Sequence, residues 1–510
     1  MNPVVIGGAP LALDDVVRVA RGRAPVALAR EVVARLTAGR RALEALDAGG
    51  QAVYGVTTGV GKLKDTLIPP AQRRELQRNL VLSHAGGVGP PLGEAETRSM
   101  VFLLAASLAR GHSGVRPELV DLLVACLTRG LTPVVPERGS VGASGDLAPL
   151  AHVALCLIGE GEAWLGGERL SARNALARVD LEPVTLEMKE GLALLNGTHF
   201  MTGLGVLLVE DAGRLARLAD ITGAMSLEAL MGSNAAFDPR IHALRPHPGQ
   251  VASAANLRAL TRDSAIIASH RDCTRVQDAY SLRCMPQVHG AAREAMGFAK
   301  AVLEREINSV TDNPLLFTEE PQVLSGGNFH GQPLALALDT LAIGLTQLAG
   351  IAERRIDRLV NPLTNEGLPP FLSPRGGLHS GYMIAQYVAA ALASQCRALS
   401  HPASVDSSPT SGLQEDWNSM GAGAALKARE ILGHVRQVLA IELLLAGQAL
   451  DLRRPLTGGA GTRAAHAALR ESVPPLDADR ALHADLAQAL RLVEAGAVEG
   501  AVERAIGGLA

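Results

Sequence analysis

The most informative segment of the chain is residues 139–149, Gly-Ser-Val-Gly-Ala-Ser-Gly-Asp-Leu-Ala-Pro. Its small residues permit an unusually tight backbone. If the amide nitrogen of Gly145 is pressed onto the carbonyl carbon of Ala143, a five-membered ring can close, and loss of water from Ser144 then leaves an exocyclic methylidene. Gly145 offers the least hindered amide nitrogen, and its small neighbours allow backbone compression. The product would be an electrophile made from the protein alone.

Two simpler interpretations of this segment compete with ring formation. An isolated Ala-Ser-Gly-Asp sequence is most often an ordinary turn. A serine-hydrolase elbow needs Gly-x-Ser-x-Gly, but Asp146 stands where the second glycine is required. The hydrolase is therefore excluded, whereas the choice between a turn and an electrophile depends on the rest of the sequence.

Three further segments carry side chains that can bind or activate an amino acid. Tyr54 begins the glycine-rich loop 54–61, and Asn196 begins an Asn-Gly-Thr sequence that could equally form an Asx turn. Gln277, Tyr280 and Arg283 are spaced by three residues, which predicts one drifting face of a helix. A guanidinium group can hold a carboxylate through two hydrogen bonds. An amide, a phenol and a guanidinium on one face would therefore suit an amino acid carboxylate, although a lone arginine is by default solvated.

The elements that must position these residues are predicted to be mostly helices. Aromatic residues make up only 3% of the chain, while Ala and Leu dominate, which favours helix packing over sheets. Long apolar periodic runs predict helices over 204–231, 291–310, 334–359, 382–399 and 422–450. Helices of roughly 25 residues would be about 37 Å long. This length suits an elongated bundle and the association of several chains along it.

The region before residue 203 is more broken, with glycine clusters at 55–61, 86–93 and 139–145. Loops of this kind often carry chemistry. The sequence therefore predicts two domains: residues 1–202 form a loop-rich helical domain with the reactive segment, and residues 203–510 form a long-helix bundle with C-terminal helices. Strands are predicted only as short pieces within 4–13 and 162–170, where Gly166 and Gly167 can close a hairpin.

Composition excludes several classes of protein. A chain of 510 residues exceeds what one hydrophobic core supports, and 48 basic against 51 acidic residues leave no basic block for nucleic acid. The five cysteines form no CxxC pair, which indicates reduced thiols, no metal site and a cytoplasmic location. No secretory signal is visible in residues 1–21. The charge-free stretch 376–396 contains several polar residues, so we expect a buried helix there and no membrane span.

The sequence around residues 143–146 resembles the signature of the aromatic amino acid ammonia-lyases and aminomutases. The resemblance extends over residues 54–420, and several motifs recur in the order typical of that family. It implies a mainly α, fumarase/aspartase-like fold with a smaller N-terminal domain. It also implies that Ala143, Ser144 and Gly145 form a methylidene-imidazolone (MIO) autocatalytically, with no dissociable cofactor and no metal. The family forms homotetramers whose active sites draw residues from three subunits.

The same resemblance assigns roles to the candidate residues. Tyr54 would remove the β-proton of the substrate, Asp146 would assist ring formation, and Asn196 would lie beside the MIO carbonyl. Tyr280 would also be catalytic and would lie beside the substrate carboxylate. The remaining candidates would bind substrate: Arg283 would hold its carboxylate with Gln277 nearby, and Phe329, within a Gly-Gly-Asn-Phe-His-Gly motif, would line its pocket.

Two positions resemble the branch of the family that acts on histidine: His84, which follows Ser83, and Glu415, between Gln414 and Asp416. A buried imidazole ring needs polar partners, which a histidine and a carboxylate can supply. The resemblance therefore implies deamination of L-histidine to trans-urocanate and ammonia in histidine degradation. Trp417 and Asn418 depart from the His-Val expected there. A phenylalanine or tyrosine ammonia-lyase, an aromatic aminomutase and an inactive helical scaffold remain alternatives.

Overall fold

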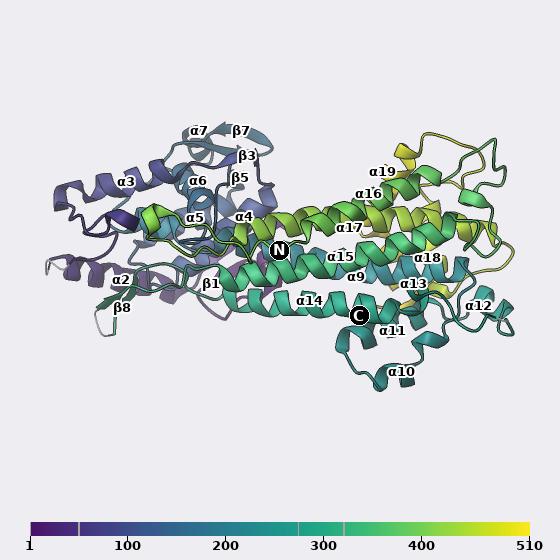
Figure 1. The fold of residues 1–510 in the computed structure, drawn as a ribbon. Helices are drawn as coiled ribbons and strands as arrows, with labels where there is room; N and C mark the ends of the chain where they lie inside the picture. Colours follow the sequence, from purple (N-terminus) through teal and green to yellow (C-terminus); the bar gives the residue numbers. More distant parts are fainter. Residues whose placement is uncertain (1, 49–51, 274, 320–321) are drawn as a thin grey trace. The chain divides into compact units, whose positions relative to one another are not determined.

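The structure is a computed structural model that describes residues 2–48, 52–273, 275–319 and 322–510 (Figure 1). Helices make up 59% of it, well above the roughly one third that is usual in globular proteins. The prediction of a mainly α fold is confirmed. The chain divides into two compact units.

Unit 1 comprises Met1–Leu207, Ala299–Asp339 and Pro402–Leu426. Its α-helices are α1 (Leu13–Ala20), α2 (Arg30–Ala48), α3 (Arg73–His84), α4 (Glu94–Leu108), α5 (Pro117–Thr128), α6 (Leu147–Leu157), α7 (Ala172–Arg178) and α8 (Glu190–Leu195). Short 3-10 helices are η1 (Gly61–Leu63), η2 (Pro70–Gln72) and η5 (Ser411–Leu413). Every side chain of α4 from position 97 onward is buried, so α4 forms the centre of this unit.

The described strands are short and all belong to unit 1. A parallel pair joins β1 (Val4–Ile6) to β2 (Val26–Leu28), and an antiparallel pair joins β3 (Val88–Pro91) to β5 (Pro136–Arg138). A three-stranded sheet has the order β4 (Leu131–Pro133), β6 (Glu162–Leu165), β7 (Glu168–Ser171), and β8 (Leu315–Phe317) pairs with β9 (Gln322–Leu324). The β6–β7 hairpin confirms the strand prediction at Gly166 and Gly167.

Three helices of unit 1 position the candidate residues. α3, α6 and α8 pack against one another. His84 is the last residue of α3, Asp146 directly precedes α6, and Asn196 directly follows α8. Packing the three helices together therefore gathers three sequence motifs that are far apart in the chain.

Unit 2 comprises Leu208–Phe298, Thr340–His401 and Lys427–Ala510. Its helices are α10 (Pro239–Ala243), α11 (Pro248–Leu260), α12 (Ala265–Ser269), α13 (Tyr280–Arg283), α16 (Met383–Leu399), α18 (Ala460–Arg470), α19 (Leu482–Glu494) and α20 (Ala497–Ile506), with 3-10 helices η3 (Ala235–Phe237) and η4 (Pro370–Leu372).

Four long helices belong to both units, because the boundaries between the units fall within them. They are α9 (His199–Ala229), α14 (Met285–Glu306), α15 (Gln332–Val360) and α17 (Gly421–Leu452). Each matches a helix predicted from the apolar periodicity. The predicted domains, 1–202 and 203–510, are continuous stretches, whereas both compact units are assembled from three separate segments.

Inside unit 2, the long helices are joined by a buried polar cluster around Glu442 of α17. The carboxylate accepts hydrogen bonds from Thr222 and Ser226 of α9, at 2.7 and 2.8 Å, and from the guanidinium of Arg355 of α15. All four side chains are fully buried. A buried ion pair of this kind is retained only where its remaining hydrogen-bonding groups are satisfied.

The apolar helices show two patterns of burial. Among the described residues, α15 is the helix long and apolar enough to cross a membrane, but 67% of its most apolar stretch is buried inside the structure, as in a core helix. The predicted buried helix within 376–396 was partly wrong. α16 begins only at Met383 and buries a single stripe ending at Cys396, whereas Ile384 and Tyr387 are 54% and 59% exposed.

Candidate active site

The reactive segment is folded tightly against its neighbours in unit 1. Gly142 and Gly145 have positive φ angles of 71° and 75°. A Cβ atom on Gly145 would overlap the carbonyl group of Gly197, and one on Gly142 would overlap the hydroxyl of Ser419. The amide of Met420 donates to Val141 O at 2.9 Å. Only glycine fits at positions 142 and 145, as the ring-forming interpretation requires.

Asp146 is fully buried and bridges the reactive segment to helix α9. Its Oδ2 accepts hydrogen bonds from the backbone amides of Phe200 and Met201, both at 3.0 Å, in the first turn of α9. Its Oδ1 accepts from Ser140 Oγ at 3.0 Å. Burial raises the pKa of Asp146 to about 7, although these hydrogen bonds act to lower it. The carboxyl group therefore fixes the segment where ring closure would occur.

Six of the predicted site residues line one cavity of about 570 Å³ in unit 1. They are Tyr54, His84, Ser144, Asn196, Phe329 and Glu415. Ala143, Gly145 and Asp146 are buried directly beside Ser144. The structure thus brings nine of the twelve predicted residues together.

Tyr54 is held by its own glycine loop. Its hydroxyl accepts a hydrogen bond from the amide of Gly61 at 2.8 Å, and Lys62 N donates to Ser411 Oγ at 3.3 Å. The pKa of Tyr54 is raised above 10, chiefly by burial and further by the charge of Glu415, while the Gly61 amide lowers it. Within one chain, these surroundings therefore favour the neutral phenol.

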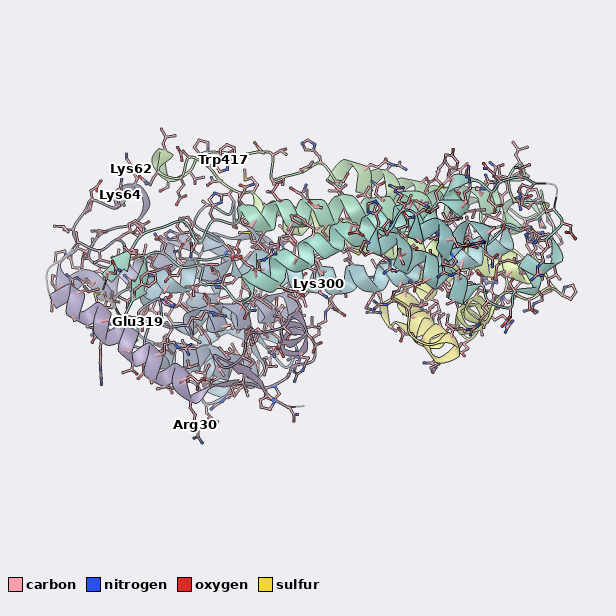
Figure 2. The ribbon with its side chains drawn as sticks, turned by 90° about the horizontal axis from the view of Figure 1, so that it is seen from below. Arg30, Lys62, Lys64, Lys300, Glu319 and Trp417 are labelled. Carbon is pink, nitrogen blue, oxygen red and sulfur yellow. The ribbon has the colours of Figure 1, made fainter. Side chains whose placement is uncertain are left out.

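Two lysines also contribute to the lining of this cavity. Lys62 and Lys64 line it, and Figure 2 shows both side chains on the outside of the ribbon, in the same region as Trp417. Lys64 Nζ donates to Gln414 Oε1 at 3.0 Å. The loop that carries Tyr54 is therefore tied to the loop that carries Glu415.

The tautomer of His84 follows from its hydrogen bonds. Its Nδ1 lies 2.8 Å from the carbonyl oxygen of Leu80. Because a carbonyl oxygen can only accept, Nδ1 must carry the hydrogen. The Nε2 of a neutral His84 is then an acceptor, free for a ligand with an N–H group.

Glu415 is fixed from two sides. Its Oε1 accepts from Ser144 Oγ at 3.1 Å, and its Oε2 accepts from Thr410 Oγ1 at 2.7 Å. Asn418, which is 1% exposed, donates through Nδ2 to Thr410 Oγ1 at 3.3 Å. Trp417 is 64% exposed. The unexpected Trp-Asn pair therefore leaves Glu415 in the cavity, and its asparagine supports the glutamate through Thr410.

Sequence reasoning missed the groups that hold Asn196. Its Nδ2 donates to Asp312 Oδ1 at 3.2 Å and to the carbonyl oxygen of Asn313 at 3.1 Å. Asp312 also accepts from Lys189 Nζ at 2.6 Å, and both charged groups are buried. Asp312-Asn313-Pro314 is visible in the sequence as a signal that ends a helix, but its contact with Asn196 is a tertiary one.

The three remaining candidates lie in unit 2 and do not line this cavity. Gln277 lines a separate cavity of about 710 Å³. The prediction that it shares a helix face with Tyr280 and Arg283 was wrong, because α13 begins at Tyr280 after an extended Ala279. Tyr280 is 71% exposed, and the Arg283 guanidinium carbon lies 4.7 Å from the centre of its ring. Arg283 and Tyr280 are thus adjacent to each other, as predicted.

Residues 11–471 match the family described as aromatic amino acid lyase. The chain belongs to the aromatic amino acid lyase family. It is similar to the histidine ammonia-lyases of Sorangium cellulosum and Gloeobacter violaceus, with 55% identity to each. The alignment with the Sorangium cellulosum protein covers 98% of this chain and 99% of that protein. The alignment with the Gloeobacter violaceus protein covers 99% of this chain and 98% of that protein.

Solved structures of aromatic amino acid lyases and aminomutases share the fold. Histidine ammonia-lyase from Trypanosoma cruzi superposes with a TM-score of 0.91 at 42% identity, covering 99% of this chain and 96% of that one. Tyrosine aminomutase from Streptomyces globisporus gives 0.93 at 40% identity, covering 99% of both chains. The resemblance inferred from the motifs is confirmed.

Proposed function

We propose that this protein removes ammonia from L-histidine without oxidation and releases trans-urocanate, the reaction of a histidine ammonia-lyase. The observation that carries the proposal is that Tyr54, His84, Ser144 and Glu415 line one cavity. The histidine ammonia-lyases that match this chain over nearly its whole length support the choice of substrate. We place the enzyme in the cytoplasm as a homotetramer, acting in histidine degradation.

The residues at positions 143–145 fit an MIO formed in place. Gly145 has no room for a side chain and presents an unhindered amide, while Ser144, whose Cβ would become the methylidene carbon, lines the cavity. When formed, this group supplies a carbon electrophile for the substrate amine. Asp146 keeps the segment anchored to α9.

His84 and Glu415 are the residues that recognise the imidazole ring. The Nε2 of a neutral His84 accepts a ring N–H, and the carboxylate of Glu415 can accept another. A phenyl ring would offer no hydrogen-bond partner to the His84 Nε2 or to the Glu415 carboxylate, which disfavours it against an imidazole ring. Phe329 supplies an apolar wall for the flat ring.

Tyr54 is the base that removes the β-proton of the substrate. The Gly61 amide that donates to its hydroxyl also stabilises the phenolate formed before proton removal. Burial and Glu415 nevertheless raise the pKa of Tyr54. Lys62 and Lys64 line the same cavity, but the pKa of Tyr54 is still raised. Proton removal near neutral pH therefore requires a further cation close to Tyr54.

We propose that another copy of the chain supplies both this cation and the site that binds the substrate carboxylate. Arg283 carries an Nε that has no hydrogen-bond partner among the described residues, and Tyr280 beside it is exposed. In a homotetramer, Gln277, Tyr280 and Arg283 of one subunit would complete the cavity of another. Arg283 would then pair with the substrate carboxylate.

The experiment is ultraviolet-monitored deamination by the purified protein with no added cofactor. L-Histidine should produce the absorbance of conjugated urocanate, and Ser144→Ala should lose both the activity and the mass decrease of about 36 Da that two lost waters cause. Full activity of Ser144→Ala would refute the cofactor. Faster reaction of L-phenylalanine or L-tyrosine would refute the substrate.

One structural relative favours a second candidate, an aminomutase. The Streptomyces globisporus tyrosine aminomutase superposes on this chain as well as the lyases do. Such an enzyme returns ammonia to the β-carbon, so β-amino acid among the products would identify it. An unmodified intact mass with no activity on any of these amino acids would instead indicate an inactive scaffold.

A further inference from the structure

The hydroxyl of Ser144 has one hydrogen-bond partner among the described residues, and that partner is the carboxyl group of Glu415. The two oxygen atoms lie 3.1 Å apart. The two residues are 271 positions apart in the sequence, so this contact depends on the complete fold of unit 1. The carboxyl group of Asp146, although closer in sequence, accepts from Ser140, Phe200 and Met201.

This contact matters because the Ser144 hydroxyl is the group that must leave when the methylidene forms. Hydroxide is a poor leaving group, whereas water is a good one, so an acid within hydrogen-bonding distance accelerates the step. We propose that Glu415 has a second role, as the acid that protonates Ser144 Oγ during formation of the MIO. This inference rests on the proposed function, because it requires that the MIO forms.

The proposed step balances without any co-reactant. Ring closure first joins Gly145 N to the carbonyl carbon of Ala143 and releases one water, made of the Ala143 carbonyl oxygen and the amide hydrogens of Gly145 and Ser144. The Cα–H bond of Ser144 then breaks, its electron pair forms the Cα–Cβ double bond, and the Cβ–Oγ bond breaks. Oγ leaves as water, with its own hydrogen and the proton from Glu415. The Cα proton passes to solvent, from which Glu415 regains a proton.

The geometry holds Glu415 ready for this step. Thr410 donates to its second carboxyl oxygen, and the backbones of the two residues are also paired, with Thr410 N donating to Glu415 O at 2.8 Å. Asn418 in turn donates to Thr410 Oγ1. The carboxyl group therefore cannot turn away from Ser144 without breaking the Thr410 hydrogen bond. In the folded chain Ser144 Oγ donates to Glu415 Oε1, so for this step Oε1 must carry a proton and donate to Oγ instead. The two oxygen atoms are already in place, and only the proton changes position.

The decisive variant is Glu415→Gln, which keeps the size and hydrogen-bonding capacity of the side chain but cannot deliver a proton. Protein would be sampled at intervals after induction of expression, and the peptide containing residues 143–145 would be weighed by mass spectrometry. We expect a species about 18 Da lighter than the unmodified peptide to accumulate. The second loss of water should be about 100-fold slower than in the wild type.

His84→Gln is the matched control, because His84 lines the same cavity without contacting Ser144. It should lose about 36 Da at the wild-type rate. Glu415→Asp keeps an acid and should lose the second water faster than Glu415→Gln. Thermal unfolding of each variant shows whether the fold is intact, and Glu415→Asp supplies the comparison if Glu415→Gln folds poorly.

The possible outcomes separate this inference from the proposed function. A wild-type protein that never loses about 36 Da would refute the MIO itself. A wild type that loses both waters, with Glu415→Gln losing them at the same rate, would refute only the second role of Glu415. A folded Glu415→Gln variant that loses neither water would assign Glu415 to ring closure and overturn its role as the acid for elimination.

Discussion

A single carboxylate, Asp312, holds both ends of the short helix that delivers Asn196 to the cavity. Lys189 precedes α8 and Asn196 follows it, and both side chains donate to Asp312. Lys189 has a left-handed backbone with φ of 74°, which turns its chain into the helix. Burial lowers the pKa of Lys189, whereas Asp312 raises it. The ion pair is therefore the main compensation for burying that charge.

Replacing Lys189 with Met should destabilise the protein and weaken catalysis together. The substitution leaves Asp312 buried without its cation, which typically costs about 3–5 kcal/mol. Asn196 would also lose its fixed position, so kcat should fall more than KM rises. Urea unfolding and steady-state kinetics measure the two effects. The double variant Lys189→Met/Asp312→Asn should recover most of the stability, and a failure to recover it would contradict the ion-pair explanation.

His199 is a second buried residue with an unusual environment. It begins α9, is fully surrounded by protein, and neither ring nitrogen has a hydrogen-bond partner among the described residues. It lines a cavity of about 10 Å³ with Thr202 and Glu306, a space large enough for about one water molecule. Burial lowers the pKa of His199 to about 4, and Asp312 only partly opposes this. The folded protein therefore keeps this imidazole neutral.

This environment predicts acid sensitivity. In the unfolded chain the pKa of a histidine is about 6.5, so the unfolded state binds more protons between pH 6.5 and pH 4. The stability that His199 contributes is present above pH 6.5 and is lost as the pH falls toward 4, by up to about 3 kcal/mol. Urea unfolding at pH 7 and at pH 4.5 should show a smaller loss for His199→Leu than for the wild type. Equal losses would show that other groups control the acid sensitivity.

The sequence predicted the cavity residues well but not the residues that support them. Ser144, Tyr54 and Glu415 belong to motifs with recognisable spacing, so their chemistry is visible without coordinates. Lys189 and Asp312 are 123 positions apart. Their pairing is created by tertiary packing, which a linear motif does not record.

At the scale of helices, the close crossing of α11 and α14 in unit 2 depends on two glycines. A Cβ atom on Gly249 of α11 would lie 2.5 Å from Gly290 O of α14, and one on Gly290 would lie equally close to Gln250 N. Such distances are too short for real side-chain contacts. The two backbones therefore touch directly, with no side chain between them.

Gly290→Ala should force these helices apart and cost about 1–3 kcal/mol of stability. Gly297 lies on the same helix with no atom near its missing Cβ, so it provides a matched control. Gly297→Ala should be neutral or stabilise the protein by up to about 1 kcal/mol, because alanine favours helix. Thermal unfolding of both variants gives the comparison. Equal behaviour of the two would exclude a direct backbone contact at Gly290.

Helices were easier to predict than their ends and their exposed faces. The apolar runs that predicted α9, α15 and α17 reflect their burial. α15 buries one long face, whereas α9 and α17 are buried all round over residues 218–229 and 438–450. The same reasoning failed at Gln277, because the helix there is only four residues long and starts at Tyr280. It also failed for part of α16, since Ala and Val alone do not reveal which face packs inside the chain and which is left exposed.

At the scale of the whole molecule, the candidate residues are divided between the two units. Nine belong to unit 1, whereas Gln277, Tyr280 and Arg283 belong to unit 2. The sequence predicted which residues belong to the candidate site, but it did not predict that they are divided between two compact units. Apolar periodicity does not show where a long helix passes from one compact unit to the other.

If sites are shared between subunits, two inactive variants should restore activity to each other. Tyr54→Phe and Arg283→Ala should each be nearly inactive alone. Co-expressed in one cell, they should form mixed tetramers in which about one quarter of the sites combine an intact Tyr54 with an intact Arg283. Activity of the co-expressed protein measures this, and mixing the two after separate purification is the control. No recovery in mixed tetramers would mean that both residues act in the same subunit.

Unit 1 is assembled from segments that are far apart in the sequence, and this affects when the protein can become active during its synthesis. Ser419 and Met420 hold the backbone of residues 141–142, and Glu415 contacts Ser144. These partners leave the ribosome more than 270 residues after the segment that they bind. A nascent chain must therefore be more than four-fifths complete before the reactive segment can reach this arrangement, and the proposed MIO would then form only on a nearly complete chain.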